Sequence, residues 1–271
     1  MKDIRIAAVI YHSPVGKTRS NLDGMVEWIK EARKKGVDII CFPEMNITGY
    51  SKRREIIIDL AEPVKGPVTL ELLNIAESEN IIILAGIAER DEEGRIFASH
   101  LVIKPDGDIG VYRKLHIAPP ESSIFTPGDK VPLFEAHGVK FGIQLCYDTH
   151  FPELSTHMAL KGADLIFMPH ASPRGTPDEK YKSWMRHLPA RAYDNSLFIV
   201  ACNQSGENEN GLSFPGIALI ISTSGDIIKK YLNDKEGMVV ANLKADDFAE
   251  VRDHKMKFFL PNRKPELYNL K

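Results

Sequence analysis

One of the three cysteines in this chain has a sequence context suited to chemistry. Cys146 ends the apolar run VKFGIQLC and is followed by the polar turn YDTH and then by Pro152, which suits the start of a helix. The unpaired N–H groups and positive end of a nearby helix would favour a thiolate or hold an oxyanion. The common alternative for a cysteine at a strand end is simple burial. Cys41 and Cys202, inside apolar runs, fit that alternative, so Cys146 is the candidate nucleophile.

Two charged residues are candidates for its partners, one just after a strand-like segment and one within another. Glu44 comes directly after the mostly apolar run VDIICF, where a carboxylate is partly desolvated, and this raises its pKa and suits a general base. Lys114 lies in the segment VYRKLH. Each has an ordinary alternative, a loop glutamate in water and a solvated strand lysine. The three segments become informative when they are considered together.

The first half of the chain alternates strands with helices. Apolar residues recur at helical spacing from Leu22 to Ala32, with Ser20 or Asn21 placed to cap that helix and Gly36 placed to end it. Two later strands flank the turn PDGD, whose residue types suit a tight reversal. The predicted strands are 4–10, 37–42, 81–87, 97–104 and 109–112, and the predicted helices are 22–32 and 68–79.

The alternation begins again after a long loop that runs to about residue 130. It predicts strands at 139–146, 164–169 and 197–203, helices at 152–161 and 178–194, and two more strands around the turn SGD. Continuous apolar runs such as IIILAGI and LFIVAC indicate strands buried on both faces. We therefore predict an α/β fold of two similar halves, with two mixed sheets packed together and helices outside.

No linker or low-complexity segment divides the sequence, so we predict a single domain over 1–271. Its last part, 249–271, combines charges with aromatic residues and prolines, and we interpret it as a C-terminal arm that reaches a partner subunit.

Composition narrows the class of partner. Lys and Arg number 35 against 37 Asp and Glu, which gives a formal net charge of −2 and no basic footprint for nucleic acid. The apolar run near the N-terminus is too short to span a membrane and has no cleavage site. Three cysteines without a CxxC motif indicate a reducing compartment, so we predict a cytoplasmic location. The nine histidines show no metal-ligand spacing, and no metal or other cofactor is predicted.

Taken together, the three segments resemble the nitrilase superfamily of carbon–nitrogen hydrolases, in its amidase- and carbamoylase-like branch. The glutamate motif is FPEMNITGY, the lysine motif is YRKLH and the cysteine motif is LCYDTHFPE, in the order of that family. Further matches are FTPGD, ARAYDN, VACNQSG and NRKPELY, so the resemblance covers the whole chain.

The resemblance implies a four-layer α-β-β-α sandwich with pseudo-twofold halves that assembles into homodimers or larger homo-oligomers. It implies that Glu44 takes the proton of Cys146 and that Lys114 and the Tyr147 backbone N–H stabilise the oxyanion. An acyl-thioester would form and then be hydrolysed. Glu121, just before FTPGD, matches a further family glutamate that helps to position the lysine. Its alternative is a loop carboxylate.

The choice of substrate depends on weaker signals. True nitrilases in the family usually carry Trp-Glu after the cysteine, so the Tyr-Asp pair here favours a small amide. His150 stands where relatives that act on carboxylate-bearing ω-amides have arginine, which puts that contact in doubt. Arg174, in the loop HASPRGTP, is a candidate substitute anion partner or a solvated residue. Tyr50 and Trp184 either line the site or pack.

Three other functions compete with an amidase. A true nitrilase would use the same triad on nitriles, and an N-carbamoyl amide hydrolase would release carbon dioxide with ammonia. A non-catalytic interaction scaffold is the alternative from another class, and the ordered triad argues against it.

Overall fold

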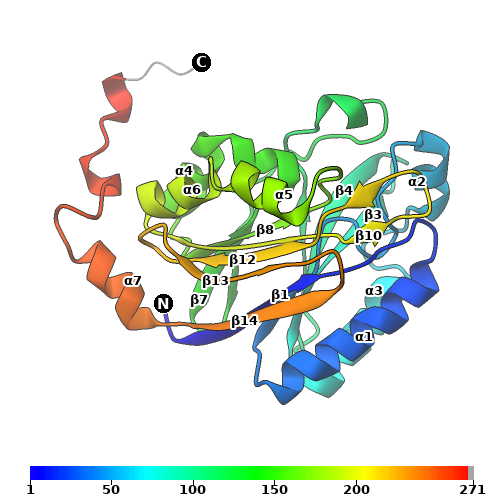
Figure 1. Ribbon diagram of the computed structural model, residues 1–271, viewed down its shortest axis with the longest axis horizontal. Helices are drawn as coiled ribbons and strands as arrows, with labels where there is room; N and C mark the ends of the chain where they lie inside the picture. Colours follow the sequence, from blue (N-terminus) through cyan, green and yellow to red (C-terminus); the bar gives the residue numbers. More distant parts are fainter. Residues whose placement is uncertain (268–271) are drawn as a thin grey trace.

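Two six-stranded sheets form the centre of the molecule (Figure 1). The structure is a computed structural model and describes residues 1–267. The first sheet has the strand order β14-β1-β2-β3-β4-β5, and the second has the order β13-β12-β9-β8-β7-β6. The predicted pair of mixed sheets is confirmed.

The first sheet combines the beginning of the chain with a strand from near its end. Its strands are β1 (Ile4–Ile10), β2 (Ile39–Cys41), β3 (Ile82–Arg90), β4 (Ile96–Ile103), β5 (Ile109–Arg113) and β14 (Gly237–Leu243). Strands β1, β2 and β3 are parallel, and the other pairs are antiparallel. The five N-terminal strands were predicted, and β14 was not.

The second sheet repeats the pairing pattern of the first. Its strands are β6 (Phe134–Ala136), β7 (Val139–Ile143), β8 (Leu165–His170), β9 (Phe198–Asn203), β12 (Ile217–Ile221) and β13 (Ile227–Leu232). From β6 to β13 the pairs are antiparallel, parallel, parallel, antiparallel and antiparallel, as they are from β14 to β5. The predicted similarity of the two halves is confirmed. Strands β10 (Gly206–Glu207) and β11 (Ser213–Phe214) form a separate small sheet.

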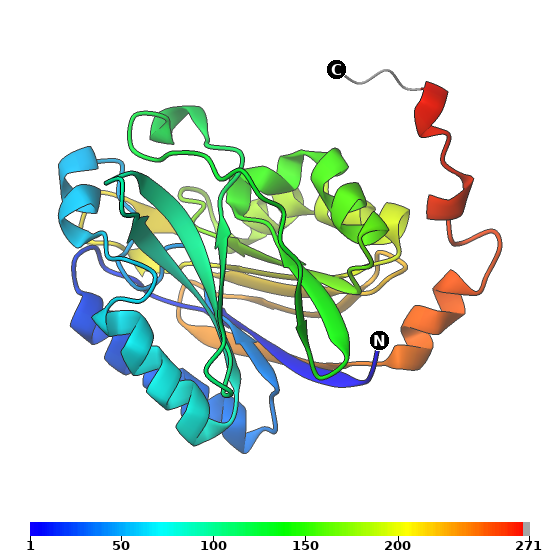
Figure 2. The same cartoon turned by 180° about the vertical axis from the view of Figure 1, so that it is seen from behind.

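Helices cover the outer faces of both sheets (Figures 1 and 2). Apolar residues of α1 (Thr18–Lys34) and α3 (Pro67–Glu79) share one core cluster with the first sheet. A second cluster joins the two sheets to α4 (Pro152–Leu160), α5 (Pro177–Trp184) and α6 (Leu188–Asn195). This is the predicted α-β-β-α sandwich. Two further helices are α2 (Arg54–Leu60) and α7 (Ala245–Arg252).

Two local predictions are wrong. Helix α1 starts at Thr18, and Asn21 lies inside it, buried, with its side-chain amide donating to the carbonyls of Pro14 and Ile47. Neither Ser20 nor Asn21 therefore caps the helix. The single helix predicted over 178–194 is two helices, α5 and α6. Pro189 explains the break, because it has no N–H to donate to the preceding turn and is tolerated only where a helix begins.

The C-terminal segment leaves the sandwich beside the outer helices (Figure 2). The predicted arm over 249–271 begins inside α7, and it continues through short 3-10 turns at Leu260–Asn262 and Pro265–Leu267. The ring of Phe259 lies 5.4 Å from that of Tyr193, which fastens this segment to α6. Residues 268–271 of the predicted arm are outside the described part. None of the helices in residues 1–267 is long and apolar enough to cross a membrane.

Candidate active site

Glu44 is held in the interior just beyond β2. Its carboxylate accepts a hydrogen bond from Lys114 Nζ at 2.8 Å and another from the Ala171 N–H at 2.9 Å. Burial raises the pKa of this carboxyl, and the charge of Glu121 adds to the effect, while Lys114 opposes it. Gly86 on β3 makes room for this segment, because a Cβ there would lie 2.2 Å from the Met45 nitrogen. The predicted desolvated glutamate with a raised pKa is confirmed.

Lys114 directly follows β5 and is almost fully buried, with 1% of its surface exposed. Its backbone N–H donates to the carbonyl of Ala98, so the end of the β4–β5 pair fixes its position. Its ammonium donates to Glu44 and Glu121, each at 2.8 Å. Burial lowers the pKa of Lys114, but the two carboxylates outweigh burial and raise it. Lys114 therefore carries a permanent positive charge, and it is not the solvated lysine of the alternative interpretation.

Glu121 completes the charged cluster from a short 3-10 helix at Pro119–Glu121. One carboxylate oxygen accepts from Lys114, and the other accepts from the Tyr50 hydroxyl at 2.6 Å. Glu121 is 5% exposed, so it is not a loop carboxylate in water. Tyr50 is itself buried, and its backbone carbonyl accepts from Asn208. Tyr50 thus fixes Glu121, and Glu121 fixes the lysine.

Cys146 occupies an unusual backbone position. The predicted strand 139–146 is too long, because β7 ends at Ile143 and Cys146 is the first residue of the 3-10 turn Cys146–His150. Its φ of 43° is in the left-handed region, which is uncommon for a residue with a Cβ. The residue is partly exposed, so a substrate can reach it.

The thiol of Cys146 is protonated at rest. Burial and the charge of Glu44 raise its pKa, and Lys114 and Lys180 reverse only part of this effect. The expectation that the turn would favour a thiolate is therefore wrong. The 3-10 turn is short and α4 begins only at Pro152, so the backbone N–H groups do not outweigh desolvation and the neighbouring carboxylates. Attack by this sulfur would need a base to remove the proton, and Glu44, whose pKa burial raises, is the candidate.

Asp148 connects the cysteine turn to the segment that carries the lysine. It is completely buried, and one oxygen accepts from the Leu145 N–H at 3.0 Å and from the Tyr112 hydroxyl at 2.8 Å. The other oxygen accepts from the His116 N–H at 2.8 Å. The sequence interpretation used Asp148 only as a marker of substrate class. The turn YDTH is polar and looks exposed in the sequence, so nothing there indicates that Asp148 connects two segments.

Lys180 on α5 was missed by the sequence interpretation. Its ammonium donates to Ser172 Oγ at 2.8 Å and to the Pro173 carbonyl at 3.2 Å, and its charge acts on Cys146. The helix sequence PDEKYKSW is strongly charged and looks exposed to water throughout. Nothing in that pattern distinguishes one lysine from the other.

The remaining predicted substrate contacts lie at different depths. Tyr147 is partly exposed, with its ring 5.8 Å from the exposed His150, whose ring stacks on His187 at 4.6 Å. Trp184 is buried against His170 at 4.3 Å and packs in the core. Arg174 is exposed, and its backbone N–H donates to the Ser213 carbonyl.

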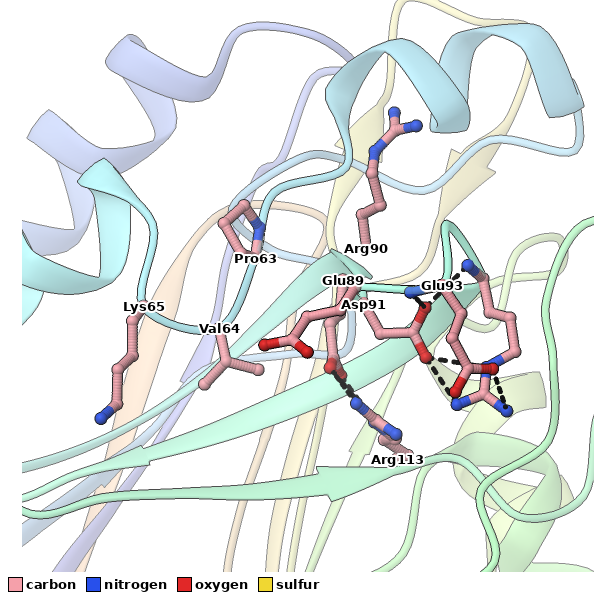
Figure 3. A pocket seen from close by; sticks show the side chains of 10 residues that line it. Pro63, Val64, Lys65, Glu89, Arg90, Asp91, Glu93 and Arg113 are labelled. Atoms are coloured by element: carbon pink, nitrogen blue, oxygen red, sulfur yellow. Dashed lines mark hydrogen bonds and ion pairs between the residues drawn. The ribbon is translucent and has the colours of Figure 1, made fainter.

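A separate hollow of about 670 Å³ opens at the ends of β3 and β5 (Figure 3). Glu89, Arg90, Asp91 and Arg113 are among its lining residues, and Glu89 pairs with Arg113. None of Glu44, Lys114, Glu121 or Cys146 lines it, so it is distinct from the candidate active site. Over residues 1–267, no group of three or more His, Cys, Asp or Glu side chains is placed to hold a metal ion.

Comparisons with known proteins show the family of the chain. The family model for carbon-nitrogen hydrolases matches residues 5–253. A nitrilase from Pyrococcus abyssi is 30% identical, covering 98% of this chain and 99% of its own length. An omega-amidase from Xenopus tropicalis is 28% identical over 86% of each chain. The predicted enzyme class, a carbon–nitrogen hydrolase, is confirmed by these relatives.

The fold agrees with solved structures as well. A CN-hydrolase superfamily protein from Xanthomonas campestris superimposes with a TM-score of 0.87 at 24% identity, covering 97% of this chain and 98% of that chain. That protein carries an arsenic adduct in its active site. Sequence motifs, fold and relatives together show that this chain belongs to the nitrilase superfamily of carbon–nitrogen hydrolases.

Proposed function

We propose that this enzyme hydrolyses the C–N bond of a small linear amide through an acyl-enzyme on Cys146, releasing ammonia or an amine and an acid. The observation that carries the proposal is the buried ammonium of Lys114, held between Glu44 and Glu121 close to a partly exposed thiol. Relatives named as amidases, and the Tyr-Asp pair after the cysteine, support an amide as substrate.

The first half of the reaction forms a thioester. Glu44 accepts the thiol proton of Cys146, and the thiolate attacks the carbonyl carbon of the amide. The carbonyl oxygen becomes negative, and the Lys114 ammonium and the Tyr147 backbone N–H stabilise that charge. Protonated Glu44 then donates its proton to the departing nitrogen as the C–N bond breaks. Ammonia or an amine leaves, and the acyl group stays on sulfur.

The second half releases the acid. Glu44, again unprotonated, accepts a proton from water, and the resulting hydroxide attacks the thioester carbon. Lys114 stabilises the second oxyanion, the C–S bond breaks, and the proton returns from Glu44 to the sulfur. Glu121 is the positioning residue in this scheme, because it holds the lysine ammonium through the whole cycle.

Ammonia release tests the proposal directly. We expect turnover of short aliphatic amides or ω-amides, a burst of ammonia equal to the enzyme concentration where hydrolysis of the thioester is slower, and no turnover by Cys146→Ala. Lys182→Met, an exposed change on α5, should retain activity and serves as the control. Full activity in Cys146→Ala, or no activity on any amide, nitrile or N-carbamoyl compound, would overturn the proposal.

The same panel separates the related activities. The Pyrococcus abyssi relative is named a nitrilase, which makes nitriles the main competing substrate class. Faster turnover of a nitrile than of the matching amide would assign a nitrilase. Carbon dioxide released together with ammonia would assign an N-carbamoyl amide hydrolase.

We also propose that the enzyme is a cytoplasmic homo-oligomer. The outer side of α4 and α6 and the neighbouring C-terminal segment expose large apolar side chains, namely Leu160, Tyr193, Met256 and Phe259. A second copy of the chain would bury them. All three cysteines are unpaired, which suits a reducing compartment.

A further inference from the structure

A half-buried lysine of α5, Lys180, donates to the loop after β8, next to the residue whose N–H binds Glu44. Two of the three ammonium protons of Lys180 go to neutral oxygens, those of Ser172 and Pro173. Within residues 1–267, no carboxylate lies within 4 Å of the ammonium, whereas Lys114 has two. Partial burial disfavours the charged form of Lys180 and lowers its pKa, and an anion bound to the free N–H would oppose that effect.

The loop that holds Lys180 also holds the catalytic base. Ser172 accepts from the lysine, its backbone N–H donates to Asn203 at 2.8 Å, and the preceding Ala171 N–H donates to Glu44. One hydrogen bond therefore joins the ammonium to Ser172, and another joins the adjacent Ala171 to Glu44. The charge of Lys180 lowers the pKa of the Cys146 thiol, and a thiolate there would in turn raise the pKa of Lys180.

The groups around Lys180 offer it no negative charge. His150, His170 and His187 lie near one another, and burial lowers the pKa of each, to about 4 for His187. These imidazoles are therefore neutral near pH 7. The nearest carboxylates that act on the thiol, Glu44 and Glu121, are already paired with Lys114. Residues 1–267 therefore supply no counter-ion to Lys180, and its free N–H is available to an anion from outside the protein.

We propose that Lys180 binds an anionic group of the substrate, a carboxylate carried on the acyl side of the amide, while the amide carbon meets Cys146. This inference rests on the proposed function and narrows it to amides that carry a carboxylate. It assigns to Lys180 the binding of the substrate anion, a role that the sequence analysis considered for His150 and Arg174. Lys180 is then a specificity-determining residue. Its hydrogen bonds to Ser172 Oγ and the Pro173 carbonyl orient the free N–H.

Matched pairs of substrates test the assignment. Succinamate and butyramide have the same length and differ in whether the chain ends in a carboxylate, and glutaramate and valeramide form a second pair. We expect the wild-type enzyme to favour the carboxylate member of at least one pair. Lys180→Met should lower kcat/KM for that member about 30-fold, because a hydrogen bond between charged groups is lost, with the neutral member changed less than about threefold. Lys180→Arg should restore much of the loss.

Controls separate this role from a purely structural one. Lys182→Met removes an exposed cation from the same helix and should leave both members of each pair unchanged. Equal losses on charged and neutral amides in Lys180→Met would mean that Lys180 only supports the loop, and would overturn the inference. Unchanged kinetics on both would overturn it as well.

Binding to an inactive variant distinguishes failure of this inference from failure of the proposed function. Calorimetry with Cys146→Ala should show succinamate or glutaramate binding at least tenfold more tightly than the matching neutral amide, and Cys146→Ala/Lys180→Met should lose that preference. Binding without turnover by the wild type would sink the amidase proposal and leave the anion site intact. Turnover of amides without any carboxylate preference would do the reverse.

Discussion

The Lys114 ammonium donates to both Glu44 and Glu121, and both of these neighbours affect the pKa of Glu44. Lys114 lowers the pKa of Glu44, while Glu121 and burial raise it, with the rise prevailing. A raised pKa is what Glu44 needs if it is to hold a proton between the two halves of the proposed reaction. The protonation of the cluster therefore belongs to the three groups together.

The first prediction concerns Glu121→Gln, which keeps the side-chain shape and removes the charge. Without the repulsion from Glu121, the pKa of Glu44 should fall, so Glu44 becomes a weaker base. We expect kcat to drop by about tenfold to a hundredfold, within the usual range for general acid–base catalysis. The acid limb of the pH–rate profile should move to lower pH.

Tyr50→Phe is the matched control for Glu121→Gln. It removes one hydrogen bond to Glu121 but leaves the carboxylate charge, so the acid limb should stay near its wild-type position. An acid limb that does not move in Glu121→Gln would contradict the role given to that charge.

The second prediction is the pH dependence of the wild-type enzyme. Glu44 must be unprotonated to accept the thiol proton, and its pKa lies above the ordinary 4.5, so kcat/KM should fall as the pH drops through that raised value. Because the pKa of Lys114 is raised above 10.5, loss of its charge should not limit activity at pH 9. Measurement of kcat/KM from pH 4 to 10 with one neutral amide checks both limbs. An acid limb centred at or below 4.5 would count against Glu44 as the base.

At the scale of elements, the site forms where the ends of strands from both sheets meet. Glu44 follows β2 and Lys114 follows β5 in the first sheet, while Cys146 follows β7 and Ala171 follows β8 in the second. The two sheets pack face to face, so these strand ends share one region of the molecule (Figure 1). Hydrogen bonds across the sheet interface, such as that from Ala171 to Glu44, hold the segments together.

The third prediction concerns Asp148→Asn at this junction. The amide that replaces one oxygen cannot accept, so at least one buried donor among Leu145, Tyr112 and His116 loses its partner. We expect a loss of about 1–3 kcal/mol in the free energy of unfolding, measured with urea, because unsatisfied buried donors carry that cost. Turnover should fall too, since the turn at Cys146 loses its attachment.

Tyr112→Phe provides the comparison for Asp148→Asn. It removes a single donor and leaves the carboxylate with its two backbone bonds, so the loss should be about 1 kcal/mol. A change in stability below about 0.5 kcal/mol for Asp148→Asn would show that the turn is held by other contacts.

At the scale of the whole molecule, strands from near the two ends of the chain pair with each other. Strand β14, from near the C-terminus, pairs with β1 along its whole length, and β1 also contacts β9 and β12 of the second sheet. One apolar cluster draws on both sheets. We propose on these grounds that residues 1–271 form a single domain, in which neither half keeps its core without the other.

The fourth prediction is that the protein is at least a dimer in solution. Tyr193 is 46% exposed beside Phe259, and a partner that covers this surface would bury both rings. Light scattering after gel filtration should give at least twice the mass of the chain. Tyr193→Glu should reduce that mass to one chain, because it places a charge in the interface. A wild-type monomer at micromolar concentration would contradict the prediction.

The sequence alone determined most of the strands and the family, and it supplied the candidate triad. Long apolar runs are local signals of buried strands, and the motifs around Glu44, Lys114 and Cys146 keep their order along the chain. A desolvated glutamate after an apolar run was also foreseeable, because its burial follows from the run itself.

Only the tertiary structure decided which groups meet. It placed Tyr50 on Glu121, joined Asp148 to Tyr112 and His116, and brought β14 beside β1. Within residues 1–267 it gave the Lys180 ammonium only the neutral oxygens of Ser172 and Pro173 as acceptors. It also gave Cys146 its positive φ and a raised pKa in place of the expected thiolate. The physical reason is that burial patterns and secondary-structure propensities depend on residues that are close in sequence. The charges and hydrogen bonds around a buried group come from residues far away in the chain.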